Sequence, residues 1–493
     1  MTTLRQTLDE AVQLQESGRA DEAAALCRVI LAKTPDHAET LHLAGVLAYQ
    51  RGDIDAALAF IDKAIAREPG AANFHNSRGL VHRAQGRLGE AAAAHRRALE
   101  LAPDFYEAAS NLGNALHQQG EIAAAIDCYR RALALAPGHA VLNSNLGTAL
   151  YDLGDLTGAE DCYRRAIAAN PNYTDAHFHL GMVRLHRGDY AEGWREYEWR
   201  WRAHTFRIAR RNFGVPQWRG EDLNGARILL HVEQGFGDAL QFVRYAPLVA
   251  ARDGRVILGA PDPLRRLFAG ILGIERVVGK SGATPDFAWH APLMSLPLAF
   301  GTELASVPAA IPYLGVDAAI AEHWRERIGT GGKSLRIGLV WAGQQSWKSH
   351  YVRALPVEAL APLAAVPGVE FFSLQKNAAA PLSWARDLAP ELGDFADTAG
   401  AIGALDLVIT VDTAVAHLAG ALGKPVWIML QRVPDWRWLE TRGDSPWYPS
   451  ARLFRQTVAG EWAGPIERVA AALRQLPKTG PGMAGPNNTQ NKV

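Results

Sequence analysis

"NLGNALHQQGEIAAAIDCYRRALALAP", residues 111–137, is the stretch that decides the fold of the first two-fifths of the chain. Its glycine, alanine and proline recur every 34 residues in both directions. The three series are Gly45, Gly79, Gly113, Gly147 and Gly181; Ala23, Ala57, Ala91, Ala125 and Ala159; and Pro35, Pro69, Pro103, Pro137 and Pro171. Three residue types kept in one register over five periods indicate a repeat architecture.

Each 34-residue unit predicts two helices. A turn containing glycine separates them, and proline ends the second helix because it cannot continue one. Apolar residues such as Leu112 and Leu116 follow the spacing of three or four residues that marks a buried helical stripe. Units of this kind stack on one another, so the sequence predicts an α-solenoid. The turn glycines are Gly52, Gly86, Gly120, Gly154 and Gly188.

The unit resembles the tetratricopeptide repeat, and the resemblance covers residues 4 to about 205 as six units. The first unit has Ala11 in place of the glycine, and the last departs after Gly193 into "GWREYEWRW", as terminal units often do. The resemblance implies a superhelix whose concave face binds a peptide or protein. Recurring asparagines on the first helices are candidates to bind an extended peptide backbone, or else form a solvated polar face: Asn111, Asn114, Asn143 and Asn145.

Composition excludes several classes of partner. The 493 residues are enough for two or three domains, and 51 basic residues balance 51 acidic ones, so no global field favours nucleic acid. The amino terminus lacks the apolar region of a signal peptide, and no run of about 18 apolar residues occurs, so we expect no membrane span and a cytoplasmic location. Cys27, Cys128 and Cys162 occupy apolar helix positions and are expected in the core.

A new domain is predicted where tryptophan first appears. All fourteen tryptophans lie at or after Trp194. We place the solenoid at 1–205 and an aromatic connector at 206–225. The aromatic residues around this boundary predict a hydrophobic seam between domains, with a ligand-binding aromatic box as the other interpretation: Trp194, Trp199, Trp201, Phe213 and Trp218.

Beyond the connector, short apolar runs alternate with helical patterns, which is typical of a parallel sheet covered by helices. The runs are residues 227–234, 255–260, 275–279, 336–343, 369–375, 405–412 and 425–430. They form two sets and predict two Rossmann-like halves, 226–320 and 335–477, so the fold class is a multidomain α-solenoid plus α/β. Ligands of such sheets bind at the carboxyl ends of the strands, which places the active site in a cleft between the halves. Residues 478–493, rich in Gly, Pro and Asn, are predicted to be disordered.

"VDTAVAHLAGALGKPVWIML", residues 411–430, carries the strongest chemical signal. A strand ends at Asp412, and Thr413 then begins a helix whose amino-terminal N–H groups form an anion site. Ala414 leaves room for a phosphate, and His417 is one turn into the helix, within reach of a phosphate or ribose oxygen. The competing interpretation is an ordinary helix cap with a packed histidine.

The second half resembles the ADP-heptose lipopolysaccharide heptosyltransferase family of inverting glycosyltransferases, which have the GT-B fold. Two motifs carry the resemblance: the turn "GFGD", Gly235–Asp238, and the helix start Asp412–His417. Residues 394–427, "DWRW" (435–438) and "SPWYPS" (445–450) resemble bacterial proteins that fuse tetratricopeptide repeats to such a domain. The resemblance covers about residues 226–476.

The resemblance implies roles for individual residues. Asp238, in a turn with Gly235 and Gly237, corresponds to the general base on the acceptor side. Thr413, Ala414 and His417, after Asp412, correspond to the helix start that holds the nucleotide diphosphate; the family usually has Gly where this chain has Ala414. In the family, a basic residue of the loop that corresponds to residues 341–356 also contacts the phosphate. This loop contains Lys348 and Arg353, and Lys376 is a third candidate.

The implied reaction uses a nucleotide-sugar as co-substrate and needs no cofactor and no metal ion. Asp238, with Glu233 in reserve, removes the proton from the acceptor hydroxyl as it attacks the anomeric carbon. Two functions follow. One is a metal-independent inverting glycosyltransferase whose repeats recruit a protein acceptor, with glycan or lipid-linked acceptors open. The other is a protein-binding repeat scaffold with a catalytically inactive GT-B domain, in which Asp238 merely caps its helix. The sugar and the nucleotide stay open.

Overall fold

Tertiary contacts in the computed structural model divide the chain into two units, Met1–Ala176 and His177–Val493. The structure describes residues 3–206, 208–279, 284–329, 334–343, 354–378 and 381–477. We call residues 1–176 the repeat arm and residues 177–493 the two-lobed unit.

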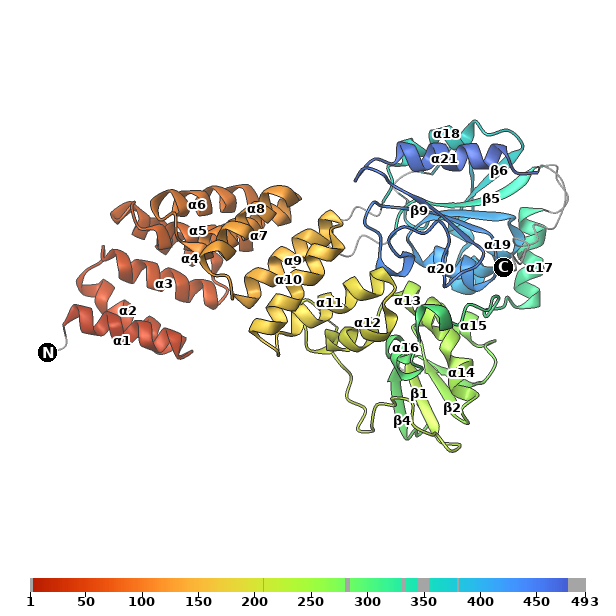
Figure 1. Cartoon of the computed structure of the whole chain (residues 1–493), viewed down its shortest axis with the longest axis horizontal. Coiled ribbons are helices and arrows are strands. Elements are labelled where there is room, and N and C mark those ends of the chain that lie inside the picture. Colours follow the sequence, from red (N-terminus) through yellow and green to blue (C-terminus); the bar gives the residue numbers. More distant parts are fainter. Residues whose placement is uncertain are drawn as a thin grey trace, which may run out of the picture. The chain divides into compact units, whose positions relative to one another are not determined.

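The repeat arm consists of helix hairpins that follow one another in chain order (Figure 1). First helices of neighbouring hairpins also contact each other, for example α5 and α7. The predicted helical solenoid is therefore confirmed. Its helices are α1 (Leu4–Glu16), α2 (Ala20–Lys33), α3 (Ala38–Gln50), α4 (Ile54–Arg67), α5 (Ala72–Ala84), α6 (Leu88–Leu101), α7 (Tyr106–Gln119), α8 (Ile122–Leu135), α9 (Ala140–Leu153) and α10 (Leu156–Ala169).

The 34-residue series have separate structural tasks. The turn glycines have φ near +80°, a left-handed conformation that favours glycine, as at Gly120 (φ 85°). Glycines of the first helices allow close packing, because a Cβ on Gly113 would lie 2.6 Å from Cε1 of Tyr129. The repeated alanines, such as Ala125, are fully buried in the second helices. The prolines lie two residues beyond those helices. Cys27 and Cys162 are buried and Cys128 is half-buried.

The two-lobed unit begins with most of α11 (Thr174–Arg187) and with α12 (Tyr190–Tyr197). The N-terminal half holds β1 (Arg227–His231), α13 (Phe236–Phe242), α14 (Ala246–Ala250), β2 (Arg255–Gly259), α15 (Asp262–Phe268), β3 (Ile274–Val278), β4 (Trp289–Pro292) and α16 (Leu296–Ala299). After α17 (Ala318–Ile328), the C-terminal half holds β5 (Leu335–Val340), α18 (Ala361–Ala364), β6 (Val369–Ser373), β7 (Arg386–Asp387), α19 (Phe395–Ala404), β8 (Leu407–Val411), α20 (Ala414–Ala421), β9 (Val426–Leu430), β10 (Ala451–Arg455) and α21 (Ala463–Arg474).

Both sheets are parallel, which confirms the predicted α/β class. The strand orders are β3-β2-β1-β4 and β10-β9-β8-β5-β6-β7. All seven predicted strands are present. The sequence did not predict β4, β7 and β10, because they are short and β4 contains a proline. The order of the second sheet is that of a dinucleotide-binding fold.

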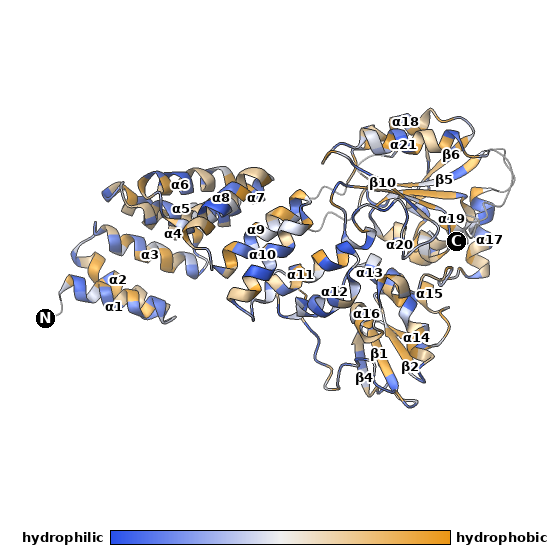
Figure 2. Ribbon diagram, viewed as in Figure 1, coloured by the Kyte–Doolittle hydropathy of each residue, from blue (hydrophilic) through white to orange (hydrophobic). Residues whose placement is uncertain are grey.

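Helices cover both faces of the C-terminal sheet, with α18 and α21 on one face and α19 and α20 on the other (Figure 1). Its strands are mostly hydrophobic along their length, as expected for a sheet buried on two sides (Figure 2). The N-terminal sheet differs. Its helices α13–α15 pack on one face, and on the other face Phe213 and Phe287 pack against Leu229, Ile257 and Val278.

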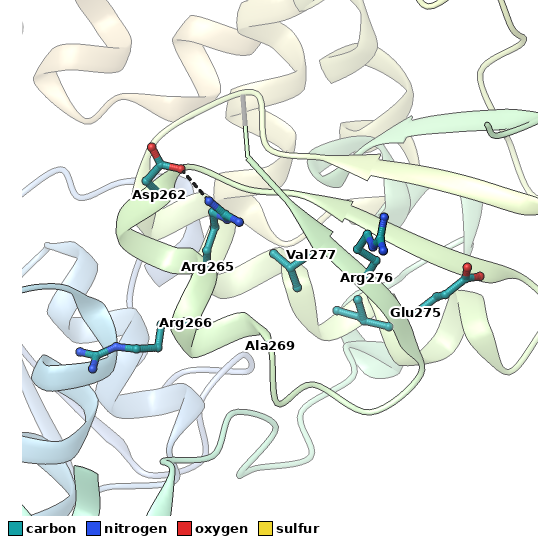
Figure 3. A pocket seen from close by; sticks show the side chains of 8 residues that line it. Asp262, Arg265, Arg266, Ala269, Glu275, Arg276 and Val277 are labelled. Atoms are coloured by element: carbon teal, nitrogen blue, oxygen red, sulfur yellow. Dashed lines mark hydrogen bonds and ion pairs between the residues drawn. The ribbon is translucent and has the colours of Figure 1, made fainter. Parts of the chain in front are cut away.

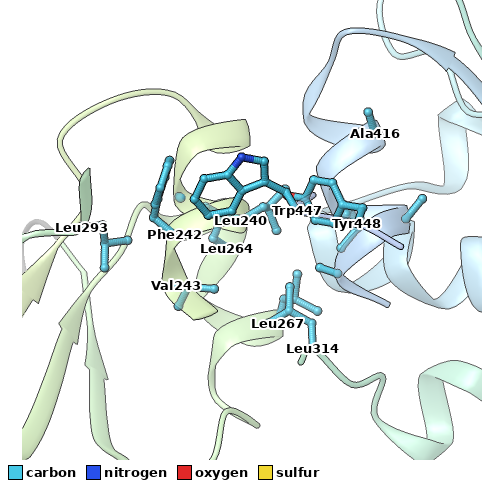
Figure 4. Close-up of a cluster of buried hydrophobic side chains, with 14 of the residues drawn as sticks. Leu240, Phe242, Val243, Leu264, Leu267, Leu293, Leu314, Ala416, Trp447 and Tyr448 are labelled. Carbon is cyan, nitrogen blue, oxygen red and sulfur yellow. The ribbon is translucent and has the colours of Figure 1, made fainter. Parts of the chain in front are cut away.

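One hydrophobic core runs through both halves, and side chains from each half contribute to it in Figure 4. The core also includes residues of α11 and α12. Trp194, from the predicted aromatic seam, lies on α12. Its ring centroid is 5.2 Å from that of Trp436 and 6.0 Å from that of Phe242, both nearly perpendicular. The indole N–H of Trp447 is within hydrogen-bonding distance, 3.0 Å, of the Tyr190 hydroxyl. The helices α11 and α12 therefore belong structurally to the two-lobed unit.

Candidate functional site

Each sheet has one place where the strand order reverses. The reversal lies between β1 and β4 in the N-terminal half and between β5 and β8 in the C-terminal half. Crevices for ligands open at such switch points, beyond the carboxyl ends of the strands. The segments that leave these strands contain the residues singled out from the sequence.

At the first switch point, two carboxylates lie near the ends of β1 and β4. The Met294 N–H, just beyond β4, donates to Oε1 of Glu233 at 3.1 Å. Asp238 lies in the first turn of α13, where its Oδ2 accepts the Gly235 N–H at 2.9 Å. Asp238 thus caps its helix, yet its side chain keeps 21% exposure. A carboxylate that is fixed and still exposed can accept a hydrogen bond from a ligand.

Glu233 is more deeply enclosed. Its side chain is 5% exposed, and burial raises its pKa to about 7 against the opposing effects of Arg200 and the Met294 N–H. Nη2 of Arg200 lies 3.5 Å from Oε1 of Glu233, and it also donates to Oγ of Ser295 at 2.8 Å. A carboxyl group that titrates near neutral pH is able to gain or lose a proton during a reaction.

Arg437 completes this corner of the site, and sequence reasoning missed it. It comes from the 3-10 turn Trp436–Trp438 and donates through Nη2 to Oδ1 of Asp238. Nε donates to Gln241 at 2.8 Å, and Nη1 to Asp435 at 2.7 Å. The signal was in "DWRW", because a buried arginine needs a carboxylate and Asp435 lies two residues before Arg437. Its partner 199 residues away was not visible in the sequence.

At the second switch point, β8 leads into the start of α20. Thr413 is the residue before the helix, and its hydroxyl lies 3.0 Å from that of Thr410 instead of capping the helix. Residues 412–415 are half-buried. Gly343, just beyond β5, is adjacent, because a Cβ on it would lie 3.7 Å from Cγ2 of Thr413. The small residues Gly343 and Ala414 therefore flank the start of α20.

His417 packs between the two halves. Its Nδ1 is 2.9 Å from the hydroxyl of Tyr448, and its ring stacks on Trp438 with centroids 5.4 Å apart. A Cβ on Gly237, in the glycine turn of the N-terminal half, would lie 2.9 Å from Cδ2 of His417. Gly237 is thus the point where α13 meets α20, and His417 is packed at this contact.

Of the three basic residues predicted to contact phosphate, the structure describes one. Lys376, after β6, is exposed, and its Nζ donates to the Leu392 carbonyl. Lys348 and Arg353 lie outside the described residues. Gln375, which the sequence did not indicate, is buried, and its Oε1 accepts the N–H groups of Trp341 (3.0 Å) and Ala342 (2.8 Å). It fixes the backbone where the chain leaves β5.

A cavity of about 540 Å³ lies elsewhere in the N-terminal half, between α15 and β3 (Figure 3). Its arginines include Arg266, which pairs with Asp394 and Asp397 of the C-terminal half. The residues predicted from the sequence lie away from its lining. Among the described residues, no cluster of three or more His, Cys, Asp or Glu side chains has the arrangement to hold a metal ion.

Polar side chains connect the first helices of the repeat arm. His42 Nε2 lies 2.8 Å from Oγ of Ser77, Asn111 Nδ2 donates to Asn76 at 3.1 Å, and Asn145 Nδ2 donates to Asn114 at 3.3 Å. We call these six residues the polar ladder. Asn143 does not join it, because it is buried and its amide donates to the carbonyls of Pro137 and His139. Asn111, Asn114 and Asn145 are half-buried and keep part of their surface exposed.

Comparisons with known proteins assign the repeats. The family model described as "Tetratricopeptide repeat" matches residues 42–104, 76–140 and 144–198. The repeats are tetratricopeptide repeats. Within the described part of the chain, every helix is too short or too polar to span a bilayer.

The individual proteins and solved structures that resemble this chain have low sequence identity to it. Protein FlbA of Caulobacter vibrioides is 28% identical over 326 residues, which cover 60% of this chain and 54% of FlbA, so the chain spans about half the length of this relative. The solved structure of TTC0263, a tetratricopeptide-repeat protein of Thermus thermophilus, is 22% identical and covers 37% of this chain and all of its own (TM-score 0.33). That of YrrB, described as a tetratricopeptide-repeat protein with an unusual peptide-binding site, is 20% identical and covers 35% of this chain and 88% of its own (TM-score 0.30).

Proposed function

We propose that this chain is an inverting, metal-independent glycosyltransferase of the GT-B type that moves a sugar from a nucleotide-sugar to a protein held by the repeats. One observation carries the proposal: the switch points of the two sheets meet. Gly237 packs on His417, and Arg437 reaches across to Asp238. A transferase needs a donor crevice and an acceptor crevice that open toward each other, and each half has one switch point at which such a crevice can form.

The donor side is the start of α20. Its first N–H groups and the positive end of the helix dipole favour the diphosphate of a nucleotide-sugar. Ala414 and Gly343 present little side-chain bulk there. The charge that develops on the leaving nucleotide also needs cations. Lys376 is a candidate for that role, and Lys348 and Arg353 remain candidates from the preceding loop.

The acceptor side is the start of α13. In the proposed reaction, Asp238 accepts the proton of an acceptor hydroxyl while the hydroxyl oxygen bonds to the anomeric carbon. The bond from that carbon to the nucleotide diphosphate breaks at the same time, so the configuration inverts. Each carboxylate oxygen of Asp238 accepts a hydrogen bond from the protein, and a carboxylate oxygen has capacity for a second. Glu233 is the reserve base, but it is less exposed than Asp238.

The repeat arm is proposed to present the acceptor protein. Asn111, Asn114 and Asn145 offer amide groups at intervals along the first helices. An extended peptide has unpaired N–H and C=O groups that such amides can bind without regard to sequence. Recognition of this kind suits an unstructured acceptor segment.

The proposal is tested by replacing the base. Full-length protein is incubated with UDP-, ADP-, GDP- and CMP-sugars, and free nucleotide is measured. With the donor that turns over, we expect Asp238→Asn to lower the rate about 10²–10⁴-fold while the nucleotide still binds. Asp262→Asn is the matched control, because Asp262 lies in the first turn of α15 in the same half and is exposed. Full activity of Asp238→Asn excludes the assigned role.

One observation favours the second function, a protein-binding scaffold with an inactive two-lobed unit. Asp238 is already engaged by the Gly235 N–H and by Arg437, as a purely structural helix cap would be. In that case none of the four nucleotides binds, and no nucleotide-sugar releases its nucleotide. The same measurements therefore separate the two functions.

A further inference from the structure

We propose that Arg437 is a positioning residue that holds Asp238 in its reactive orientation, so that catalysis depends on the contact between the two halves. The inference rests on the proposed function. It assigns a task to a residue of the C-terminal half that acts through a residue of the N-terminal half.

Arg437 is itself held rigidly. Its side chain is 8% exposed, and all three guanidinium nitrogens donate hydrogen bonds. Its guanidinium carbon lies 4.3 Å from the ring centroid of Trp436. Asp435 binds both the backbone and the side chain of Arg437. Its Oδ1 accepts a hydrogen bond from the Arg437 backbone N–H at 3.1 Å and another from Nη1. A planar guanidinium held by these contacts has a fixed orientation, so its Nε and Nη2 N–H groups point in one direction.

That direction is toward α13. Nη2 reaches Asp238, and Nε reaches Gln241, which lies one turn further along the same helix. Gln241 is fully buried. The guanidinium is therefore docked on two successive turns of α13, and not merely on one carboxylate.

Asp238 is consequently fixed from two sides. The Gly235 N–H binds Oδ2 and Arg437 binds Oδ1, so the plane of the carboxylate is set by two donors that belong to different halves. Without Arg437, the negative charges of Asp238 and Asp435 would lose the cation between them. Their repulsion would then turn the Asp238 carboxylate away from its present orientation.

Because Arg437 is buried, its role in orienting Asp238 can be distinguished from a role in binding phosphate. A cation that binds the leaving diphosphate needs N–H donors that can reach the ligand. The guanidinium donors of Arg437 point at protein acceptors. We therefore expect a change at Arg437 to lower kcat and to leave KM for the donor unchanged.

A double-mutant cycle tests the inference. The probe is the nucleotide-sugar that full-length wild type turns over fastest among UDP-glucose, ADP-glucose, GDP-mannose and CMP-sialic acid, read as free nucleotide. Arg437→Met, Asp238→Asn and the double variant are compared for kcat and KM. We expect Arg437→Met to lower kcat about 10²-fold with KM unchanged within twofold, since misplacing a reacting group by about 1 Å has that effect. In the Asp238→Asn background it should cause no further loss.

Controls keep the result interpretable. Arg442→Met removes an exposed arginine of the same half, which pairs with Asp444, and should leave kcat unchanged. Arg437→Lys keeps the charge without the planar fork, and we expect it to recover part of kcat. If Arg437→Met does not fold, the cycle is run with Arg437→Lys.

The outcomes are distinct. Loss that multiplies in the Asp238→Asn background, or a rise in KM, overturns the inference while the proposed function stands. Absence of nucleotide release by wild type from all four donors overturns the proposed function and this inference with it.

Discussion

The repeat arm and the two-lobed unit are built from contacts of very different range. In the arm, Tyr129 bonds to Asn114, 15 residues away, and Asn145 bonds to Asn114, 31 residues away. In the two-lobed unit, Arg437 binds a partner 199 residues away, and Arg244 donates to the Trp447 carbonyl, 203 residues away. The arm is therefore a sum of neighbouring repeats, whereas the two-lobed unit depends on contacts between segments that are remote in the sequence. This contrast predicts where function is modular and where it is not.

The largest effect is expected from removing the arm. Deleting residues 1–171 leaves α11 and the whole two-lobed unit in place. We expect transfer to protein to fall below detection, while release of nucleotide from the sugar donor continues at the wild-type rate within about twofold. Mass spectrometry of co-expressed acceptor proteins and a nucleotide-release assay measure the two activities. Protein transfer by the truncated chain would show that the arm is not the recruiter.

A smaller effect tests the packing inside the arm. Gly113→Ala should destabilise it by about 2–3 kcal/mol, because the new methyl group overlaps Tyr129. Gly89→Ala is the matched change, since Gly89 is also helical but exposed, and it should stabilise the arm by up to about 1 kcal/mol. Chemical unfolding followed by circular dichroism measures both variants. Equal effects of the two substitutions would show that the 34-residue glycine series has no packing role.

The smallest effect is the contribution of one buried histidine to the pH dependence of stability. His95 occupies the position that Tyr129 and Tyr163 hold in the next repeats, and burial lowers its pKa to about 3. Its folded-state pKa lies below the unfolded value, so its contribution is present above about pH 6.5 and is lost as the pH falls. Between pH 7 and pH 5 we expect His95 to contribute a loss of about 1–2 kcal/mol in the free energy of unfolding, and His95→Tyr should remove that contribution. A pH profile unaltered by His95→Tyr would refute the assignment.

The same contrast explains what sequence reasoning found. In the arm, one period predicted the helices and the turns, because every partner is a neighbour in the repeat. One detail of the arm was predicted wrongly, namely that Asn143 is available to bind a peptide. It lies two residues from Asn145, and helix positions two apart do not share a face, so Asn143 is buried where Asn145 is not.

In the two-lobed unit, the sequence predicted the main strands and the two motifs that follow β1 and β8, because both are continuous in the chain. It did not predict Arg437 or Gln375, since their partners come from remote segments. It did not predict that Phe213 of the connector covers the second face of the N-terminal sheet. Tertiary packing decides these features, and no local pattern encodes them.

The most direct test of the central account, that the start of α20 binds the phosphate of a nucleotide-sugar, is a nucleotide-binding measurement by thermal shift with UDP, ADP, GDP and CMP. We predict that one nucleotide stabilises the full chain by about 3 kcal/mol at a hundredfold excess over Kd. Ala414→Glu should abolish the shift, because its carboxylate takes the anion position while it suits a helix start. Ala318→Glu, the same change at the first residue of α17, should preserve it. No shift with any of the four nucleotides, or an undiminished shift in Ala414→Glu, would contradict the account.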